Sequence, residues 1–262
     1  MKEVTMSLEL SAEQLLENWN KLIGYIPQYF EGERKEKLTE MYNHFQDRMM
    51  YAPASGREHY HNAFPGGYVM HIINVTESCL KIAKVWEEMG ATPDWTEENI
   101  VFCAMHHDLG KVGDMEQDYY VPNPSEWHRI NQGKIYDFNK NLNYMTVTDR
   151  ACYLLMKFGV DMTEQEYLAL RLTDGLYEEG NTSYLKSFMP EYGLKSHLPH
   201  ILHQGDMLST KVENEMWKRS VAGKPTKPIG VKKKKTDIKS VAKNANGSDL
   251  EDLFGDLFKD KK

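Results

Sequence analysis

Apolar residues recur through most of this chain at the three- and four-residue spacing that places side chains on one face of a helix. The segments with this pattern are residues 11–26, 33–49, 68–89, 96–108, 148–158, 163–172 and 198–219. Ser11 with Gln14 and Thr163 with Glu166 have the form of capping boxes, which favour helix starts. The pattern predicts an all-α bundle in which residues 1–50 form N-terminal helices packed on the core, with a break at Pro27.

Two segments between the helices lack this period. Residues 51–67 form an irregular, cation-rich loop in which Arg57 and His61 are candidates for contact with a phosphate, although a solvated loop explains them equally well. Residues 115–148 are aromatic and polar, and such an insertion often forms a specificity wall whose aromatic rings stack a base. A β-hairpin or ordinary loop packing is an equally good interpretation. His128 in this segment is a candidate general acid or substrate contact.

The composition changes after Arg219, and residues 218–247 are predicted to form a flexible basic linker. Residues 248–262 then carry a C-terminal peptide with an apolar helical face, formed by Leu250, Leu253, Phe254, Leu257 and Phe258. A helix this short needs a groove to be stable. A partner protein is one candidate for that groove, and the chain's own domain is the other.

The formal net charge of -7 is unevenly distributed along the 262 residues. Residues 218–248 contain ten Lys or Arg against one acid, whereas residues 1–217 carry a net charge of -14. An acidic body does not coat nucleic acid in general, so any such contact should be local. Three cysteines without CxxC spacing, no visible signal peptide and no long apolar run predict a cytoplasmic protein without a membrane span.

Polar residues stand in unusual places beside two of the apolar segments. His107 and Asp108 end a buried apolar run, and His71 lies near the start of an earlier one. Imidazole and carboxylate groups are ligands for divalent metals, so with a downstream acid they predict a metal site. Gly110, just beyond the pair, is expected to end this helix as a C-cap with a positive φ.

The order His71, His107-Asp108, Asp206 resembles the H…HD…D signature of the HD-domain metal-dependent phosphohydrolases. Pro65-Gly66-Gly67 before His71 and the His107–Lys111 turn resemble motifs of a branch that includes bacterial 3′–5′ exoribonucleases. The resemblance covers roughly residues 50–217 and implies an HD-domain helical bundle over residues 51–217. It also implies that His71, His107, Asp108 and Asp206 are metal ligands.

The implied chemistry is phosphate-ester hydrolysis with one divalent metal, which the ligand types allow to be Mn, Mg, Fe, Ni or Zn. Lys111 would neutralise a phosphoryl oxygen or, alternatively, complement a helix C-terminus. Asp114 would orient Lys111 or the attacking water. Asp174 stands where that branch has a further histidine, which favours a single metal and leaves Asp174 as a ligand or general base.

These features predict a phosphohydrolase that acts on a nucleotide or nucleic-acid phosphate ester. The alternative is a weakly active or inactive HD-fold adaptor that its C-terminal peptide tethers to a replication or transcription complex. That peptide resembles the sliding-clamp-binding tails of phage replication and late-transcription proteins. A phage origin would place the protein in the host cytoplasm.

Overall fold

The computed structural model describes residues 10–187 and 189–221. Helices α1 to α4 span Ala12–Tyr29, Gly32–Tyr51, Gly67–Glu88 and Glu97–His106, and α5 to α9 span Glu126–Gln132, Val147–Lys157, Glu164–Arg171, Thr182–Leu185 and Leu198–Val221. The 3-10 helices are Leu109–Val112, Gly175–Tyr177, Glu179–Asn181 and Pro190–Tyr192, and the strands β1 and β2 are Tyr120–Pro122 and Tyr136–Phe138. Because helices dominate the described residues, the predicted all-α fold is confirmed.

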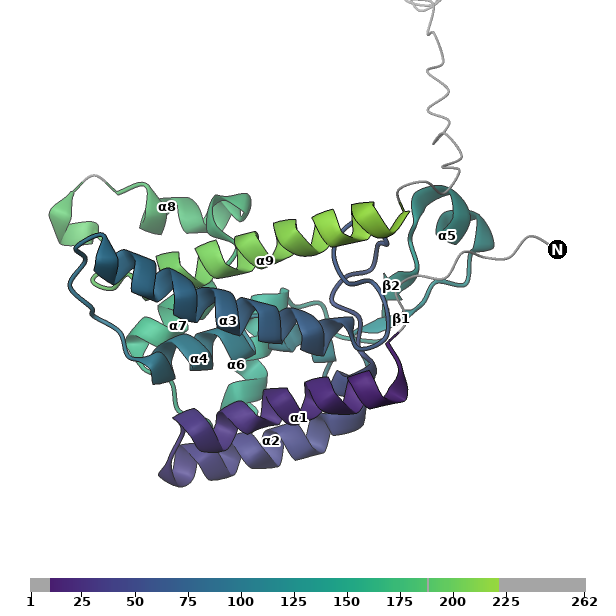
Figure 1. The fold of residues 1–262 in the computed structure, drawn as a ribbon, viewed down its shortest axis with the longest axis horizontal. Helices are drawn as coiled ribbons and strands as arrows, with labels where there is room; N and C mark the ends of the chain where they lie inside the picture. The colour runs from purple at the N-terminus through teal and green to yellow at the C-terminus, as the bar shows by residue number, and fades with distance from the viewer. Residues whose placement is uncertain (1–9, 188, 222–262) are drawn as a thin grey trace, which may run out of the picture. The chain divides into compact units, whose positions relative to one another are not determined.

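The N-terminal helices α1 and α2 lie side by side as an antiparallel pair (Figure 1). The capping box at Ser11 is confirmed, since its hydroxyl accepts from Gln14 N–H and the Gln14 side chain accepts from Ser11 N–H. Buried apolar side chains such as Trp19 and Leu22 join this pair to the core. The expected break at Pro27 is wrong, because α1 continues to Tyr29 with the proline in its last turn.

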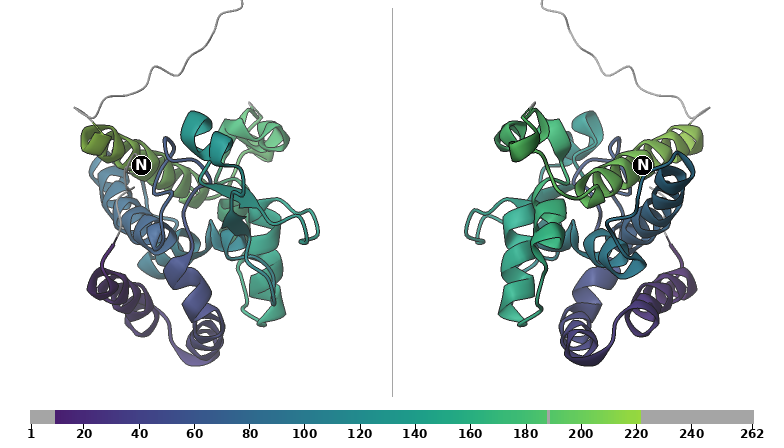
Figure 2. Two further views of the ribbon diagram at one scale, coloured as in Figure 1. Left: turned by 90° about the vertical axis from the view of Figure 1, so that its right-hand side faces the viewer. Right: turned by 90° about the vertical axis from the view of Figure 1, so that its left-hand side faces the viewer.

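Helix α3 occupies the middle of the bundle and packs most extensively on α9, with α4 as its next neighbour. The two further views show α6 and α7 on one side of this centre and the α1–α2 pair below it (Figure 2). Ile72 and Cys79 on α3 and Ile201 and Leu202 on α9 are fully or almost fully buried. This packing brings together residues more than a hundred positions apart in the sequence.

The turn after α4 differs from the prediction. Helix α4 ends at His106, His107 is its C-cap residue, and Asp108 precedes the short 3-10 helix Leu109–Val112. Gly110 lies inside that 3-10 helix without a positive φ, so its predicted C-cap role is wrong; the positive φ of 106° belongs to Gly113. Gly110 is instead needed for close packing, because a Cβ there would overlap the carbonyl of Val147 at the start of α6.

Residues 115–146 contain a small sheet, which resolves the alternatives left open for this segment. Strands β1 and β2 pair antiparallel, with Tyr120 opposite Phe138, and the short helix α5 connects them. Arg57 forms an isolated bridge with Lys134, which ties the loop before α3 to this insertion. The insertion therefore contains strands, and a helix rather than a tight turn joins them.

Helix α9 runs from Leu198 to Val221, past the predicted domain end at residue 217, so the predicted linker begins inside this helix. The predicted partner-binding residues of the C-terminal peptide lie outside the described residues. Among the described helices, none combines the length and apolar character that crossing a bilayer requires.

Candidate metal centre

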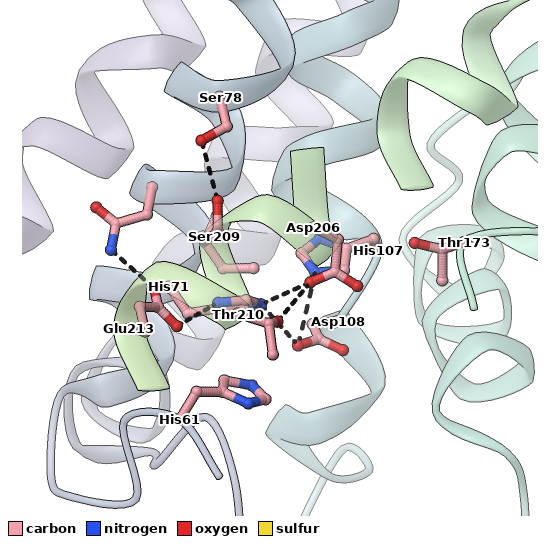
Figure 3. Close-up of polar contacts among 12 residues, drawn as sticks. His61, His71, Ser78, His107, Asp108, Thr173, Asp206, Ser209, Thr210 and Glu213 are labelled. Atoms are coloured by element: carbon pink, nitrogen blue, oxygen red, sulfur yellow. Dashed lines mark hydrogen bonds and ion pairs between the residues drawn. The ribbon is translucent and has the colours of Figure 1, made fainter. Parts of the chain in front are cut away.

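Three helices bring four of the predicted ligands to one place (Figure 3). His71 Nε2, from α3, lies 3.3 Å from Asp206 Oδ1 of α9 and 3.6 Å from Asp108 Oδ2. His107 Nε2 lies 3.6 Å from Asp108 Oδ2 and 3.8 Å from Asp206 Oδ1. The two imidazoles thus face the same two carboxylates.

The nitrogen atoms at this meeting point have no hydrogen-bond partner. Both His71 and His107 are 1% exposed, and the Nε2 atom of each is buried without a hydrogen bond, although carboxylate oxygens lie 3.3–3.8 Å away. Buried polar groups are normally hydrogen-bonded, so two such atoms side by side point to a missing partner. Neighbouring ligands of one metal with bonds of about 2.1 Å lie about 3 Å apart, close to the separations found here.

The residues present therefore fit a metal ion. Potential ligand atoms of His71, His107 and Asp108 all lie within 4.8 Å of one another, and Asp206 adds its contacts to both imidazoles. A second set with the same mutual spacing is His61, His71 and Glu213. The two sets share His71 but meet different nitrogens of its ring: Glu213 lies beside Nδ1, and Asp108 lies beside Nε2.

Electrostatics of the centre follow from two acids facing two imidazoles. Burial alone would lower the pKa of His71, but Glu213 and Asp206 outweigh it and raise that pKa to about 10. Burial likewise opposes the charged form of Asp206, yet His71 and then His107 hold the pKa of Asp206 far below its ordinary value. Both members of the pair are therefore charged at neutral pH, and a metal must displace the proton of His71 to bind there.

An open cavity of about 440 Å³ adjoins the centre, and His61, His107, Asp108, Lys111, Asp174 and Asp206 are among its lining residues. Lys111 Nζ donates to Asp108 Oδ2 over 2.6 Å. Burial lowers the pKa of Lys111, but Asp108 outweighs it and the net shift is upward, so the ammonium stays charged. Burial, then Asp108 and Asp206, raise the pKa of Asp174. The cavity thus offers a fixed cation and a more basic carboxylate.

A rigid loop places His61 at the wall of this cavity. Ser55 Oγ donates to the His61 carbonyl over 2.7 Å, and Asn214 Nδ2 of α9 donates to the carbonyls of His59 and Tyr60. Asn62, the next residue, has a φ of 44°, a conformation that asparagine tolerates better than most residues. The His61 ring centre lies 4.7 Å from that of His71.

The protonation of His61 follows from this burial. Its Nε2 is buried without a partner. Burial, His71 and Lys111 lower the pKa of His61 to about 2. A neutral imidazole therefore faces the cavity at neutral pH, with one nitrogen free for a hydrogen bond.

Three predicted site residues lie elsewhere. Asp114 accepts from the N–H groups of Glu116 and Gln117, and because Lys111 is bonded to Asp108, the prediction that Asp114 orients Lys111 is wrong. His128 is exposed on α5 and its ring contacts Trp127. The Arg57 guanidinium lies over the Tyr60 ring, 5.9 Å from its centre. Neither His128 nor Arg57 lines the cavity beside the metal centre.

A second cavity, of about 380 Å³, shares Lys111 with the first. Its aromatic lining is Tyr51, Tyr119, Tyr120 and Tyr136. Arg48 also lines it, but its Nε is paired with Asp118 over 2.8 Å. Three tyrosines of the aromatic insertion therefore line a cavity that reaches Lys111, and a role of this segment in specificity stays a prediction.

Sequence reasoning missed Glu213, which bonds His71, and Thr173, whose buried hydroxyl lines the first cavity without a partner. A signal for Glu213 was present: it lies seven residues after Asp206, on the same face of α9. Comparison of this chain with protein-family models, with curated proteins and with solved structures gave no match.

Proposed function

We propose that this chain is an HD-domain metal-dependent phosphohydrolase that acts on a phosphate ester or phosphodiester of a nucleotide or nucleic acid. The observation that carries the proposal is the meeting of two unpartnered imidazole nitrogens with two carboxylates beside an open cavity. His71, His107, Asp108 and Asp206 would hold one divalent metal, of the group Mn, Mg, Fe, Ni and Zn. The ligand order in the sequence resembles that of the HD superfamily, which supports the same assignment.

A metal held there would lower the pKa of a bound water and polarise the phosphoryl group. Lys111, already charged and oriented by Asp108, would stabilise the negative charge that develops on a phosphoryl oxygen. Asp174 would accept the proton of the attacking water, a role that its raised pKa favours. The His61 imidazole, held neutral by its surroundings, would hydrogen-bond the substrate.

The tyrosine-lined second cavity supports a nucleotide as the substrate class. Lys111 lines both cavities, so a phosphate beside Lys111 would leave its base within reach of aromatic rings. Stacking of a base on an aromatic side chain is worth about 1–3 kcal/mol.

The test combines elemental analysis with hydrolysis of bis(p-nitrophenyl) phosphate by the full chain, across added Mn²⁺, Mg²⁺, Ni²⁺ and Zn²⁺. Turnover should depend on metal and should be lost in Asp108→Asn, which keeps the side-chain size and removes the charge. Asp94→Asn is the matched control, because Asp94 pairs with His197 over 2.9 Å and lines neither cavity. Equal turnover in Asp108→Asn and the wild type would rule the proposal out. Nucleotides and oligonucleotides would then be compared as substrates.

The adaptor alternative rests on the C-terminal peptide and predicts a different result. Deletion of residues 248–262 should abolish capture of a sliding clamp and leave the hydrolysis of a small phosphodiester unchanged. Both activities can coexist, because a tether raises the local concentration of an enzyme near its substrate. If the protein binds no metal, shows no hydrolysis and still captures a clamp through this peptide, the adaptor function alone would be favoured.

A further inference from the structure

Glu213 is a buried carboxylate on α9 that lies two helical turns beyond Asp206. It is 2% exposed, and both of its oxygens are bonded. Oε2 lies 3.0 Å from His71 Nδ1, and Oε1 accepts from Asn74 Nδ2 over 2.7 Å. His71 and Asn74 are three residues apart on α3, so one carboxylate bonds two side chains of the neighbouring helix (Figure 3).

The bond to Glu213 determines which nitrogen of His71 faces the centre. When Nδ1–H donates to Glu213, Nε2 is the nitrogen that faces Asp206 and Asp108, at 3.3 and 3.6 Å, and it offers a lone pair to a metal that displaces its proton. His107 is oriented in the same way, with Nδ1 2.9 Å from the Ala104 carbonyl and Nε2 toward the same acids. Histidines that bind metals commonly donate their second N–H to a carboxylate or a carbonyl. Each imidazole therefore has the partner that leaves Nε2 available.

We propose that Glu213 is a positioning residue for the metal centre. It holds His71 in the tautomer and ring orientation that bind metal, and Asn74 holds Glu213 in turn. This inference rests on the proposed function, because Glu213 is assigned to position His71, which is a metal ligand only if that proposal holds.

The alternative is that Glu213 is itself a ligand, together with His61 and His71, since these three also fall within 4.8 Å of one another. Glu213 would then have to give up its bond to His71 Nδ1, and that nitrogen would bind the metal. His71 Nε2 would then remain buried without a partner. If Glu213 instead supports His71 from Nδ1, the metal itself becomes the partner of Nε2.

Direct titration of metal tests the role without any assay of hydrolysis. Binding of Mn²⁺ and Co²⁺ to the full chain would be measured for the wild type, Glu213→Gln and Ser209→Ala. Ser209 is the matched control, because its buried hydroxyl donates to Ser78 Oγ over 3.0 Å across the same pair of helices without touching His71. Glu213→Gln should weaken metal binding about 10- to 100-fold, the range for partners of metal-bound histidines, while Ser209→Ala stays within about twofold.

A second readout separates positioning from general loosening of the helices. The visible absorption of bound Co²⁺ should change in Glu213→Gln, because the orientation of His71 changes the ligand field, and should stay that of the wild type in Ser209→Ala. Wild-type affinity and an unchanged Co²⁺ spectrum in Glu213→Gln would overturn the inference while leaving the metal site intact. If the wild type binds two ions and Glu213→Gln binds one, Glu213 is a metal ligand, and the positioning inference is overturned as well. A wild type that binds no metal would refute the proposed function first.

Discussion

Two regions of this molecule bury charged side chains between helices, and they differ in how completely those charges are bonded. In the first, Glu166 is fully buried and accepts from Arg34 Nη2 at 2.7 Å, from Asn99 Nδ2 at 3.0 Å and from Thr163 N–H at 2.9 Å. Arg34 also donates to Glu98 and lies over the Phe102 ring, 3.9 Å from its centre. Arg34 Nε lacks a partner, yet the charge of its guanidinium is paired twice.

The second region is the candidate metal centre, where the two imidazole Nε2 atoms face carboxylates without a hydrogen bond. A network whose carboxylate is fully bonded joins α2, α4 and α7 and serves stability. A network with unbonded nitrogens beside a cavity is arranged for a ligand that the chain itself does not supply. The contrast teaches that burial of charge alone does not mark a functional site; the meeting of several unbonded nitrogens and carboxylates beside a cavity does.

The largest expected effect comes from breaking the first region. Arg34→Ala leaves Glu166 buried without its cation, and removal of one partner of a buried ion pair costs about 3–5 kcal/mol. Urea unfolding should show this loss, while metal affinity of the folded protein stays that of the wild type. Lys21→Ala removes an ion pair with Glu77 whose side chains are 48% and 40% exposed, and should cost less than about 1 kcal/mol. Equal losses from both variants would mean that the Arg34 network is not structural.

Metal should act on the second region alone. A ligand that binds only the folded state at one hundred times its dissociation constant stabilises it by about 2.7 kcal/mol. Unfolding of the wild type with Mn²⁺ and with a chelator should differ by this amount, and Arg34→Ala should show the same increment. Asp108→Asn should lose the increment. Full stabilisation of Asp108→Asn by the metal would place the binding site elsewhere in the molecule.

The sequence predicted the parts of this site that depend on residue type and local spacing. His107 and Asp108 follow a fully apolar run, so their burial was expected, and the helical pattern put His71 and Asp206 on separate long helices. The capping boxes at Ser11 and Thr163 were also readable, because a cap involves residues only three apart. The roles of these residues in catalysis stay predictions.

The parts that were missed depend on contacts between distant residues. Glu213 is 142 residues from His71, so its spacing from Asp206 could place it on the right face of α9, but only the packing of α3 on α9 reveals its bond to His71. Gly110 was predicted to be a C-cap because glycine is common there. Its actual constraint is contact with Val147, thirty-seven residues later. His128 lies in the insertion and Asp114 in the turn just before it, and neither segment has a helical period that would predict where its side chains point.

Gly110→Ala should damage the second region from within. The added Cβ would overlap the Val147 carbonyl, so the turn that carries Asp108 and Lys111 must shift away from α6. Overpacking of this kind costs about 1–3 kcal/mol and should also weaken metal binding. Gly24→Ala is the matched control, because nothing lies within 4 Å of a Cβ there and the change to alanine in a helix should stabilise by about 1 kcal/mol. Unchanged stability and metal affinity in Gly110→Ala would show that the turn can adapt.

The pH dependence of the metal-free protein is the smallest of these effects when it is taken per pH unit. Burial opposes the charged form of His71, but Glu213 and Asp206 raise its pKa from 6.5 to about 10, so between these values the folded state binds more protons than the unfolded state. The stability from this group is complete below pH 6.5 and is lost as pH rises toward 10, with a slope of at most about 1.4 kcal/mol per pH unit.

His71→Asn should remove this slope, and the difference between variant and wild type isolates it from other groups. Such a difference is needed because burial also raises the pKa of Cys79, Cys103 and Cys152, whose ionisation on unfolding adds to the loss of stability at high pH. Arg34 belongs to the other region and does not contact His71, so Arg34→Ala should retain the His71 slope of the wild type. Metal affinity should rise over the same interval, since the metal displaces the His71 proton. Identical pH profiles of stability for His71→Asn and the wild type would show that Glu213 and Asp206 do not hold His71 in its protonated form in the folded protein.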